Sequence, residues 1–240
     1  MTVGLFDSGV GGLNVLNELL KKYPHNHYIF LGDTKNLPYG DKSIQDLEKL
    51  SKNNIDFLIN KGAEIIIIAC GTVSSTCYDY LKNNYNIPIY DIISPTIDYL
   101  NNSNYKNIGV IGTTRTINSN IFDKVNKSIY KKATKDFVPI IENNLQEQSL
   151  DIIKDNLKDF NNIDCLVLGC THYPLLKKEI NSILKMPLID MGSCLANKIK
   201  LENESSFKVD LYFSSINDSV CKNIDNILDC DYSLYNIEDN

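Results

Sequence analysis

Short apolar runs alternate along the chain with amphipathic stretches, and the runs lead into small polar residues such as Gly, Ser, Thr and Asp. The clearest runs predict β-strands at residues 2–6, 27–31, 64–69, 107–111 and 164–168. Several of them are apolar throughout, as strands are when helices cover both faces of a sheet. Strands that alternate with helices in this way are typical of an α/β fold with mostly parallel sheets.

The segment after the first run shows the predicted helical partner most clearly. Leucines recur at helical spacing from Leu13 to Leu20, and Pro24 lies just beyond the pattern. Lys21 and Lys22 lie near its end, where positive charge suits the C-terminus of a helix. A strand, a loop and a helix are therefore predicted for this region.

Two sequence patterns recur at similar offsets. Gly4-Leu-Phe-Asp-Ser is echoed 105 residues later from Gly109, and the segment around Cys70 is echoed 100 residues later around Cys170. Each copy combines a loop at a strand end with a cysteine-containing loop at the carboxyl edge of a sheet. We therefore predict two similar α/β lobes whose edges face each other.

Two crossings between the lobes are expected. Ser94-Pro95 marks the first, and the Asn-, Ser- and Glu-rich stretch 201–206 marks the second. A last apolar run at 208–213 predicts a strand that rejoins the first lobe. The predicted lobes are thus residues 1–94 plus 207–240, and residues 95–206.

Charge and hydropathy exclude several classes of partner. The 24 basic and 30 acidic residues give a net charge of −6, and the basic residues are scattered, which disfavours nucleic acid. The longest apolar run, residues 65–70, is far shorter than the roughly 20 residues of a membrane-spanning helix. The first residues lack the basic segment of a secretory signal. We expect a cytoplasmic protein that acts on a small molecule and has no nucleic-acid or membrane partner, while a homodimer stays open.

Seven cysteines lie at irregular spacing without a Cys-x-x-Cys pair, which argues against a disulfide framework or a zinc ribbon and favours reduced thiols. Most are expected to be small side chains of the core. These are Cys77, Cys165, Cys194, Cys221 and Cys230.

Cys70 and Cys170 occupy equivalent positions, each after a strand and next to small residues and a threonine. Cys70 precedes a predicted helical stretch, residues 71–81, and the partial positive charge of a helix N-terminus lowers the pKa of a thiol. Cys170 precedes His172, a titratable neighbour, and Pro174, which can start a helix. We predict that both cysteines are catalytic.

Two other interpretations of these cysteines stay open. Cys165, Cys170 and His172 could ligate a metal, although their spacing is unusual and no fourth ligand completes the set. A Cys–His hydrolase would instead use Cys70 or Cys170 as its nucleophile and His172 as the general base.

Polar loops follow the first two predicted strands. Residues 7–12 match no nucleotide-binding motif, and the loop is either a simple turn or a cradle of backbone N–H groups for a carboxylate. Asp7 in it is either a helix-cap acceptor or an anion that holds a substrate ammonium group. The segments Gly32-Asp-Thr and Pro38-Tyr-Gly of the second loop predict turns.

Four motifs stand out in order along the chain: Phe6-Asp-Ser-Gly-Val-Gly-Gly-Leu, Gly32-Asp-Thr with Pro38-Tyr-Gly, Ala69-Cys-Gly-Thr, and Leu168-Gly-Cys-Thr-His-Tyr-Pro-Leu. Together they resemble the glutamate racemase family, within the aspartate/glutamate racemase superfamily, over nearly the whole chain. Ile111-Gly-Thr-Thr-Arg-Thr-Ile-Asn-Ser and Phe137-Val-Pro-Ile-Ile-Glu142 are similar to two further family segments.

The resemblance implies two α/β lobes related by a pseudo-twofold axis, with the active site in the cleft between them and neither pyridoxal phosphate nor a metal. It implies an isomerase that interconverts L- and D-glutamate and supplies D-glutamate for bacterial cell-wall peptidoglycan. In that chemistry one cysteine thiolate abstracts the Cα proton, and a second cysteine delivers a proton to the opposite face.

The same resemblance assigns a role to each catalytic residue. Cys70 matches the cysteine that takes the proton from the D-enantiomer, and Cys170 matches the one that takes it from the L-enantiomer. Asp7 and His172 match residues that assist the two cysteines, one on each side, and Glu142 matches a further acidic helper.

The other site residues implied by the resemblance would offer hydroxyl and backbone N–H groups to two carboxylates and an ammonium group. They are Ser8, Pro38, Tyr39, Gly40, Gly71, Thr72, Thr113, Thr116 and Thr171.

Two positions depart from the family pattern. Gly71 stands where the family has an asparagine whose amide contacts the substrate, and a lost charge-assisted hydrogen bond costs about 1.5–3 kcal/mol. Met191 stands where the family usually has a small serine. Two alternatives to a glutamate racemase therefore stay open: a racemase of aspartate or another acidic amino acid, and a catalytically impaired relative that binds an amino acid.

Overall fold

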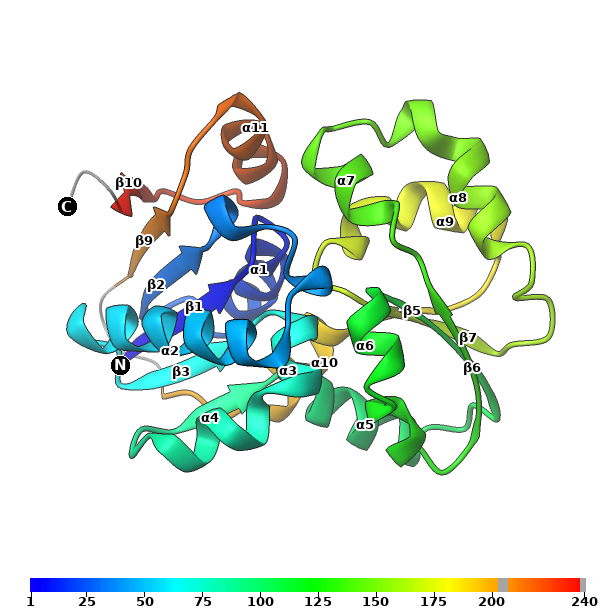
Figure 1. Ribbon diagram of the computed structural model, residues 1–240, viewed down its shortest axis with the longest axis horizontal. Coiled ribbons are helices and arrows are strands. Elements are labelled where there is room, and N and C mark those ends of the chain that lie inside the picture. The colour runs from blue at the N-terminus through cyan, green and yellow to red at the C-terminus, as the bar shows by residue number, and fades with distance from the viewer. Residues whose placement is uncertain (203–206, 238–240) are drawn as a thin grey trace.

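The strands form two separate sheets in the computed structural model, which describes residues 1–202 and 207–237 (Figure 1). Every neighbouring pair of strands in both sheets is parallel. The first sheet has the order β10-β9-β2-β1-β3-β4 and the second has the order β6-β5-β7-β8. The strands are β1 (Thr2–Asp7), β2 (His27–Gly32), β3 (Ile65–Ile68), β4 (Ile89–Asp91), β5 (Asn107–Gly112), β6 (Ser128–Ala133), β7 (Cys165–Gly169), β8 (Leu188–Asp190), β9 (Lys208–Phe213) and β10 (Ser233–Asn236).

Helices cover the faces of both sheets. The α-helices are α1 (Gly12–Lys22), α2 (Ile44–Asn60), α3 (Gly71–Thr76), α4 (Tyr78–Asn84), α5 (Ile93–Asn102), α6 (Thr114–Asn118), α7 (Phe137–Glu142), α8 (Leu150–Leu157), α9 (Lys177–Ile183), α10 (Met191–Lys198) and α11 (Asp218–Ile227). Short 3-10 helices are η1 (Thr34–Asn36), η2 (Tyr39–Asp41), η3 (Ile121–Lys124), η4 (Glu147–Ser149) and η5 (Tyr173–Leu176). No helix within the described part of the chain is long and apolar enough to cross a membrane.

The two sheets repeat one topology. The order β2-β1-β3-β4 corresponds strand by strand to β6-β5-β7-β8. The register corresponds as well, because Gly4 pairs with Ile66 in the first sheet and Gly109 pairs with Leu166 in the second. The prediction of two pseudo-symmetric α/β lobes with mostly parallel sheets is confirmed.

Alternating side chains of the central strands enter different cores. In β3, Ile65 and Ile67 pack into a core that also contains Ile108 and Val110 of β5, so this core is shared by both sheets. Helices α1, α5 and α10 contribute to it and lie between the sheets. Separate smaller cores lie under α2, α3 and α4 in the first lobe and under α7, α8 and α9 in the second.

The five central strands and the strand at 208–213 form where the apolar runs predicted them. One predicted helix is wrong in its extent, because the stretch 71–81 is interrupted at Cys77 and divides into α3 and α4. The hydroxyl groups of Ser75 and Thr76 both donate to the carbonyl oxygen of Thr72 and compete there with the helical backbone.

The C-terminal segment adds β9 and β10 to the free side of β2, so both strands belong to the first sheet. Helix α5 already begins at Ile93, ahead of the expected crossing at Ser94-Pro95. Of the second expected crossing, residues 201–206, positions 203–206 lie outside the described residues. The division into 1–94 plus 207–240 and 95–206 stays a prediction.

Candidate active site

The carboxyl edges of the two sheets face each other across a small cavity. Its volume is about 120 Å³. Of the residues predicted for the site, those that line the cavity are Ser8, Pro38, Tyr39, Gly40, Cys70, Gly71, Thr72, Thr113, Cys170, Thr171 and His172. Asp7, Thr116 and Glu142 lie behind this lining and contact it through hydrogen bonds.

Cys70 follows β3 and is the N-cap residue of α3. Its side chain is buried, and its Sγ donates a hydrogen bond of 3.8 Å to Ser8 Oγ. Burial, reinforced by the negative charge of Asp7, raises the pKa of the Cys70 thiol well above its ordinary value. The backbone N–H of Val73 at the start of α3 does lower this pKa, as predicted, but desolvation outweighs it, so the expected net lowering of the Cys70 pKa is wrong.

Asp7 ends β1 and is fully buried. Its Oδ2 accepts hydrogen bonds from the backbone N–H of Gly12, at 2.7 Å, and from Thr171 Oγ1 of the other lobe, at 3.3 Å. Its Oδ1 has no hydrogen-bond partner. Burial raises the pKa of this carboxyl group, although the charge of His172 lowers it in part. Asp7 thus caps the start of α1 and keeps one oxygen free.

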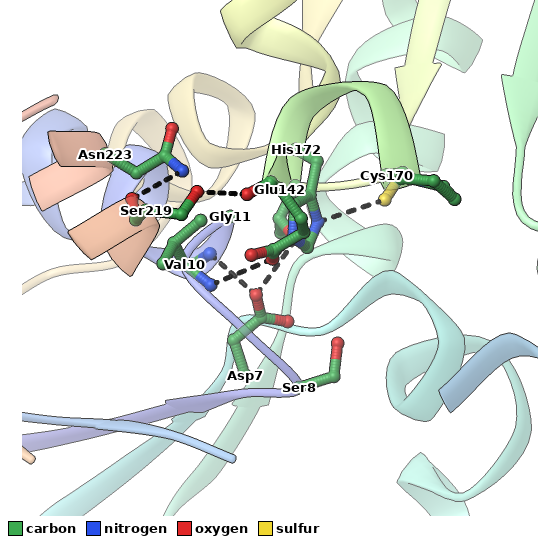
Figure 2. Close-up of polar contacts among 12 residues, drawn as sticks. Asp7, Ser8, Val10, Gly11, Glu142, Cys170, His172, Ser219 and Asn223 are labelled. Atoms are coloured by element: carbon green, nitrogen blue, oxygen red, sulfur yellow. Dashed lines mark hydrogen bonds and ion pairs between the residues drawn. The ribbon is translucent and has the colours of Figure 1, made fainter. Parts of the chain in front are cut away.

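A chain of hydrogen bonds runs from Cys170 to the first lobe (Figure 2). Cys170 Sγ lies 3.6 Å from His172 Nδ1, and His172 Nε2 lies 2.5 Å from Glu142 Oε1. Glu142 Oε1 also accepts a weaker hydrogen bond from the backbone N–H of Val10, at 3.4 Å. Burial would lower the pKa of His172, but its hydrogen bonds to Cys170 and Glu142 together raise that pKa well above its ordinary value.

The glycine-rich loop between β1 and α1 packs against the imidazole ring. A Cβ atom at Gly11 would overlap Nδ1 of His172, so only a glycine allows this close approach. Beside it, Asn14 Nδ2 donates a hydrogen bond of 2.8 Å to the carbonyl oxygen of Thr171. The loop therefore joins the first lobe to the Cys170 loop of the second.

Residues 7–199 match the Asp/Glu/Hydantoin racemase family. The chain belongs to this family. A glutamate racemase of Aquifex aeolicus is 38% identical over 225 residues, which cover 89% of each chain. The crystal structure of glutamate racemase from Francisella tularensis in complex with D-glutamate is 30% identical and superposes with a TM-score of 0.86 over 98% of this chain and 97% of that chain. Glutamate racemase from Aquifex pyrophilus is 36% identical, with a TM-score of 0.80 over 98% of both chains.

Membership of the Asp/Glu/Hydantoin racemase family makes the protein an amino-acid racemase, which is an isomerase. The geometry also bears on the metal interpretation of Cys165, Cys170 and His172. Cys165 is buried among the apolar residues shared by the two sheets, whereas Cys170 faces the core under α7, α8 and α9. Within residues 1–202 and 207–237, no three His, Cys, Asp or Glu side chains are grouped as a metal site requires.

Three threonines of this racemase form a bridge between the lobes. Thr72 Oγ1 of α3 and Thr113 Oγ1 of the second lobe lie 3.0 Å apart, and Thr116 Oγ1 lies 3.0 Å from Thr113 Oγ1. Thr113 also caps α6, because its Oγ1 accepts a hydrogen bond from the backbone N–H of Thr116. Thr116 is fully buried, so its hydroxyl group serves this bridge and does not line the cavity.

Tyr39 lines the cavity, and its hydroxyl group is hydrogen-bonded to residues behind the lining. The Tyr39 hydroxyl donates to Asp33 Oδ2 at 2.6 Å and accepts from Asn54 Nδ2 at 3.2 Å. Asp33 is itself buried and also accepts from Ser214 Oγ at 2.8 Å. Asp33 therefore fixes Tyr39, a role that the motif Gly32-Asp-Thr did not reveal because its polar pattern predicts only a turn.

Some lining residues were absent from the sequence prediction: Leu37, Asp41, Thr114, Thr134, Lys135, Val138, Pro139 and Tyr173. Thr114, Val138, Pro139 and Tyr173 lie inside segments that resemble the family, and Leu37 and Asp41 directly adjoin Pro38-Tyr-Gly, so these motifs were the available signal. Thr134 and Lys135 instead follow β6, a half-exposed edge strand whose sequence has no clear apolar run. Without that strand, these two residues could not be assigned to the sheet edge.

Proposed function

We propose that this racemase interconverts L- and D-glutamate by proton transfer at Cα between Cys70 and Cys170. The observation that carries the proposal is that both thiol groups line one small cavity from the facing edges of two pseudo-symmetric lobes. A planar carbanion between them can exchange a proton on either face. Glutamate is chosen because the curated relatives of similar length are named glutamate racemases.

In the direction from L- to D-glutamate, the Cys170 thiolate takes the α-proton. The electron pair of the broken C–H bond moves into the α-carboxylate, and Cys70 then gives its thiol proton to the opposite face of Cα. The raised pKa of Cys70 suits it to hold that proton until the carbanion forms. The reaction leaves Cys170 protonated and Cys70 as thiolate, which is the state required for the reverse direction.

His172 and Asp7 assist different cysteines, on opposite faces of the substrate. His172, charged through its hydrogen bonds to Glu142 and Cys170, stabilises negative charge on Cys170. Asp7 lies behind the cavity lining and close to Cys70, and its unpartnered carboxylate oxygen can exchange a proton with the Cys70 thiol. The hydroxyl and N–H groups of the lining, among them Ser8, Thr72 and Thr171, would hold the two carboxylates.

The product also suggests a cellular role. D-glutamate formed in the cytoplasm would serve the synthesis of bacterial peptidoglycan, as the resemblance of the motifs implies. No pyridoxal phosphate is needed in this proposal, because the two thiols and the carboxylate of the substrate account for both proton transfers.

The test is isotope exchange at Cα in heavy water. Purified protein with L-glutamate should lose optical rotation and incorporate deuterium at Cα, and D-glutamate should behave in the same way. Cys70→Ala and Cys170→Ala should each abolish racemisation, whereas Cys230→Ala, between α11 and β10 and outside the cavity lining, should not change the rate. A folded protein that neither racemises nor exchanges either enantiomer would refute glutamate as the substrate.

One observation favours a second candidate, a racemase of aspartate or another acidic amino acid. Gly71 lines the cavity and offers no side chain to the substrate. The same exchange assay with both enantiomers of aspartate decides between the two, because the true substrate will show the higher kcat/KM.

A further inference from the structure

Glu142 is held in place by a helix of the opposite lobe. Ser219 lies in the first turn of α11, which belongs to the C-terminal segment, and its hydroxyl group donates a hydrogen bond to the backbone carbonyl oxygen of Glu142 (Figure 2). Asn144 Nδ2 donates to the same Ser219 Oγ at 2.7 Å. One serine side chain thus contacts both the last residue of α7 and the turn that follows it.

The turn after α7 explains why that carbonyl group needs a donor. Asn144 has a φ of 55°, in the left-handed region, and its N–H bonds to the carbonyl of Ile141 while the N–H of Leu145 bonds to the carbonyl of Ile140. This is the Schellman arrangement that ends many helices. It satisfies the carbonyls of Ile140 and Ile141 and leaves that of Glu142 for Ser219.

Ser219 is itself fixed by its helix. Asn217 Oδ1 caps α11 by accepting from the N–H of Val220 at 2.9 Å, and Asn223 Nδ2 donates to the carbonyl of Ser219 at 3.0 Å. Asn223 is buried. The hydroxyl group of Ser219 therefore approaches Glu142 from a helix start that is held by its own hydrogen bonds.

The side chain of Glu142 extends from this anchored backbone to the catalytic histidine. Its Oε1 forms hydrogen bonds with His172 Nε2 and with the backbone N–H of Val10, and the Glu142 side chain is only 16% exposed. A displacement of the end of α7 would move the carboxylate away from His172, because Glu142 is the last residue of that helix.

We propose that Ser219 is a positioning residue for racemisation, which holds Glu142 against His172 and thereby serves the Cys170 half of the reaction. The inference rests on the proposed function, because it assumes that Cys170 and His172 exchange one of the two protons. Helix α11 lines no part of the cavity. Under this proposal it nevertheless affects proton transfer, and only on the face of the substrate that Cys170 serves.

Rates alone cannot test this one-sided role. L- and D-glutamate have equal free energies, so kcat/KM must change by the same factor in both directions. Primary isotope effects with α-deuterated substrates differ in this respect. When the Cys170 step becomes slower, the isotope effect grows with deuterated L-glutamate, whose deuterium Cys170 removes, and falls with deuterated D-glutamate, whose deuterium Cys70 removes.

The experiment compares Ser219→Ala with wild type. Loss of one hydrogen bond should lower kcat/KM by roughly three- to tenfold, with the isotope effect raised for L-glutamate and lowered for D-glutamate. Ser219→Thr keeps the hydroxyl group and should restore the wild-type isotope effects. Ser182→Ala is the matched control, because Ser182 also donates to a backbone carbonyl, that of Glu179, on the exposed side of α9.

A double variant separates positioning from a general structural defect. Glu142→Gln should shift the isotope effects in the same sense, and adding Ser219→Ala to it should change them little further. Unchanged isotope effects in Ser219→Ala, in an enzyme whose wild type racemises glutamate, would overturn the inference alone. A wild type without racemase activity on glutamate would instead refute the proposed function.

Discussion

Gly71 and Met191 face each other between the two lobes. A Cβ atom placed on Gly71 would lie 3.4 Å from Met191 Cε and 3.0 Å from the carbonyl oxygen of Gly169. Met191 is almost fully buried and packs in the core that both sheets share. The two positions at which the chain departs from the family pattern are thus neighbours, and a missing side chain in one loop coincides with a larger one in the other.

This contact changes what is expected of Gly71→Asn. The added side chain meets the Gly169 backbone and the Met191 methyl group, so the single variant should lose kcat/KM with every substrate and unfold at a lower temperature. Met191→Ser alone should lose about 2–5 kcal/mol of unfolding free energy by opening a cavity. In the double variant the asparagine gains room. The loss of kcat/KM and the loss of stability should therefore each be smaller than the sum of the losses in the two single variants.

The measurement is a double-mutant cycle on kcat/KM and on thermal stability. Additive effects at these neighbouring positions would show that Met191 does not limit the space at Gly71. Ala196→Ser is a suitable control for a polar substitution in helix α10. Ala196 is buried in that helix, and no residue of α10 lines the cavity.

Asp7→Asn should gain stability while it loses activity. Burial raises the pKa of Asp7 above its ordinary value of 3.8, so the folded state prefers the neutral form. Stability therefore falls as the pH rises from about 3.8 through the raised pKa, by about 1.4 kcal/mol for each unit of that shift. Asparagine keeps an oxygen for the Gly12 N–H and carries no charge.

Thermal unfolding of Asp7→Asn and wild type at several pH values checks this expectation. The variant should melt at a higher temperature at pH 7, and the difference should shrink toward pH 4. Asp136→Asn, at an exposed position in the second lobe, serves as the control. Equal melting temperatures at pH 7 would mean that the carboxylate of Asp7 carries no net burial cost.

Thr113→Val should weaken both a helix and the contact between the lobes. Valine keeps the shape of the side chain but loses the cap of α6 and the hydrogen bond to Thr72. The loss of a cap costs about 0.5–2 kcal/mol. We expect a lower melting temperature and a higher KM, because Thr113 also lines the cavity. Thr113→Ser keeps the hydroxyl group and should restore both values, and an unchanged KM in Thr113→Val would argue against substrate contact.

The long apolar runs predicted the central strands because those strands are buried on both faces, as the run Ile65–Ile68 illustrates. Two of the unpredicted strands, β4 and β8, are only three residues long, and β6 is an edge strand that carries Lys131 and Lys132. Such strands form because a neighbouring strand of the sheet is available for pairing, and the local sequence of a short strand contains little information about that neighbouring strand.

Sequence motifs predicted which residues line the cavity better than how those residues are held. The motifs placed Cys70, Cys170 and His172 at strand ends, and the structure brings all three to one cavity. The pKa of Cys70 could not be predicted, because it depends on burial and on the charge of Asp7 at the end of the neighbouring strand β1. Ser219 was not predicted either, since it lies 77 residues from Glu142 in the sequence.

Glu142→Gln should make the stability of the protein less dependent on pH above neutrality. Hydrogen bonds to Cys170 and Glu142 outweigh burial and raise the pKa of His172 above its ordinary value of 6.5. The stability that this raised pKa contributes is fully present below about pH 6.5 and is lost as the pH rises through the raised value. Without the charge of Glu142 the shift is smaller, so the variant should be less stable than wild type at pH 6, and the difference should diminish at alkaline pH. The free energy of unfolding, measured between pH 5.5 and pH 9, tests this, and Glu147→Gln at an exposed position is the control. A difference between Glu142→Gln and wild type that stays constant over that range would show that Glu142 acts on stability without His172.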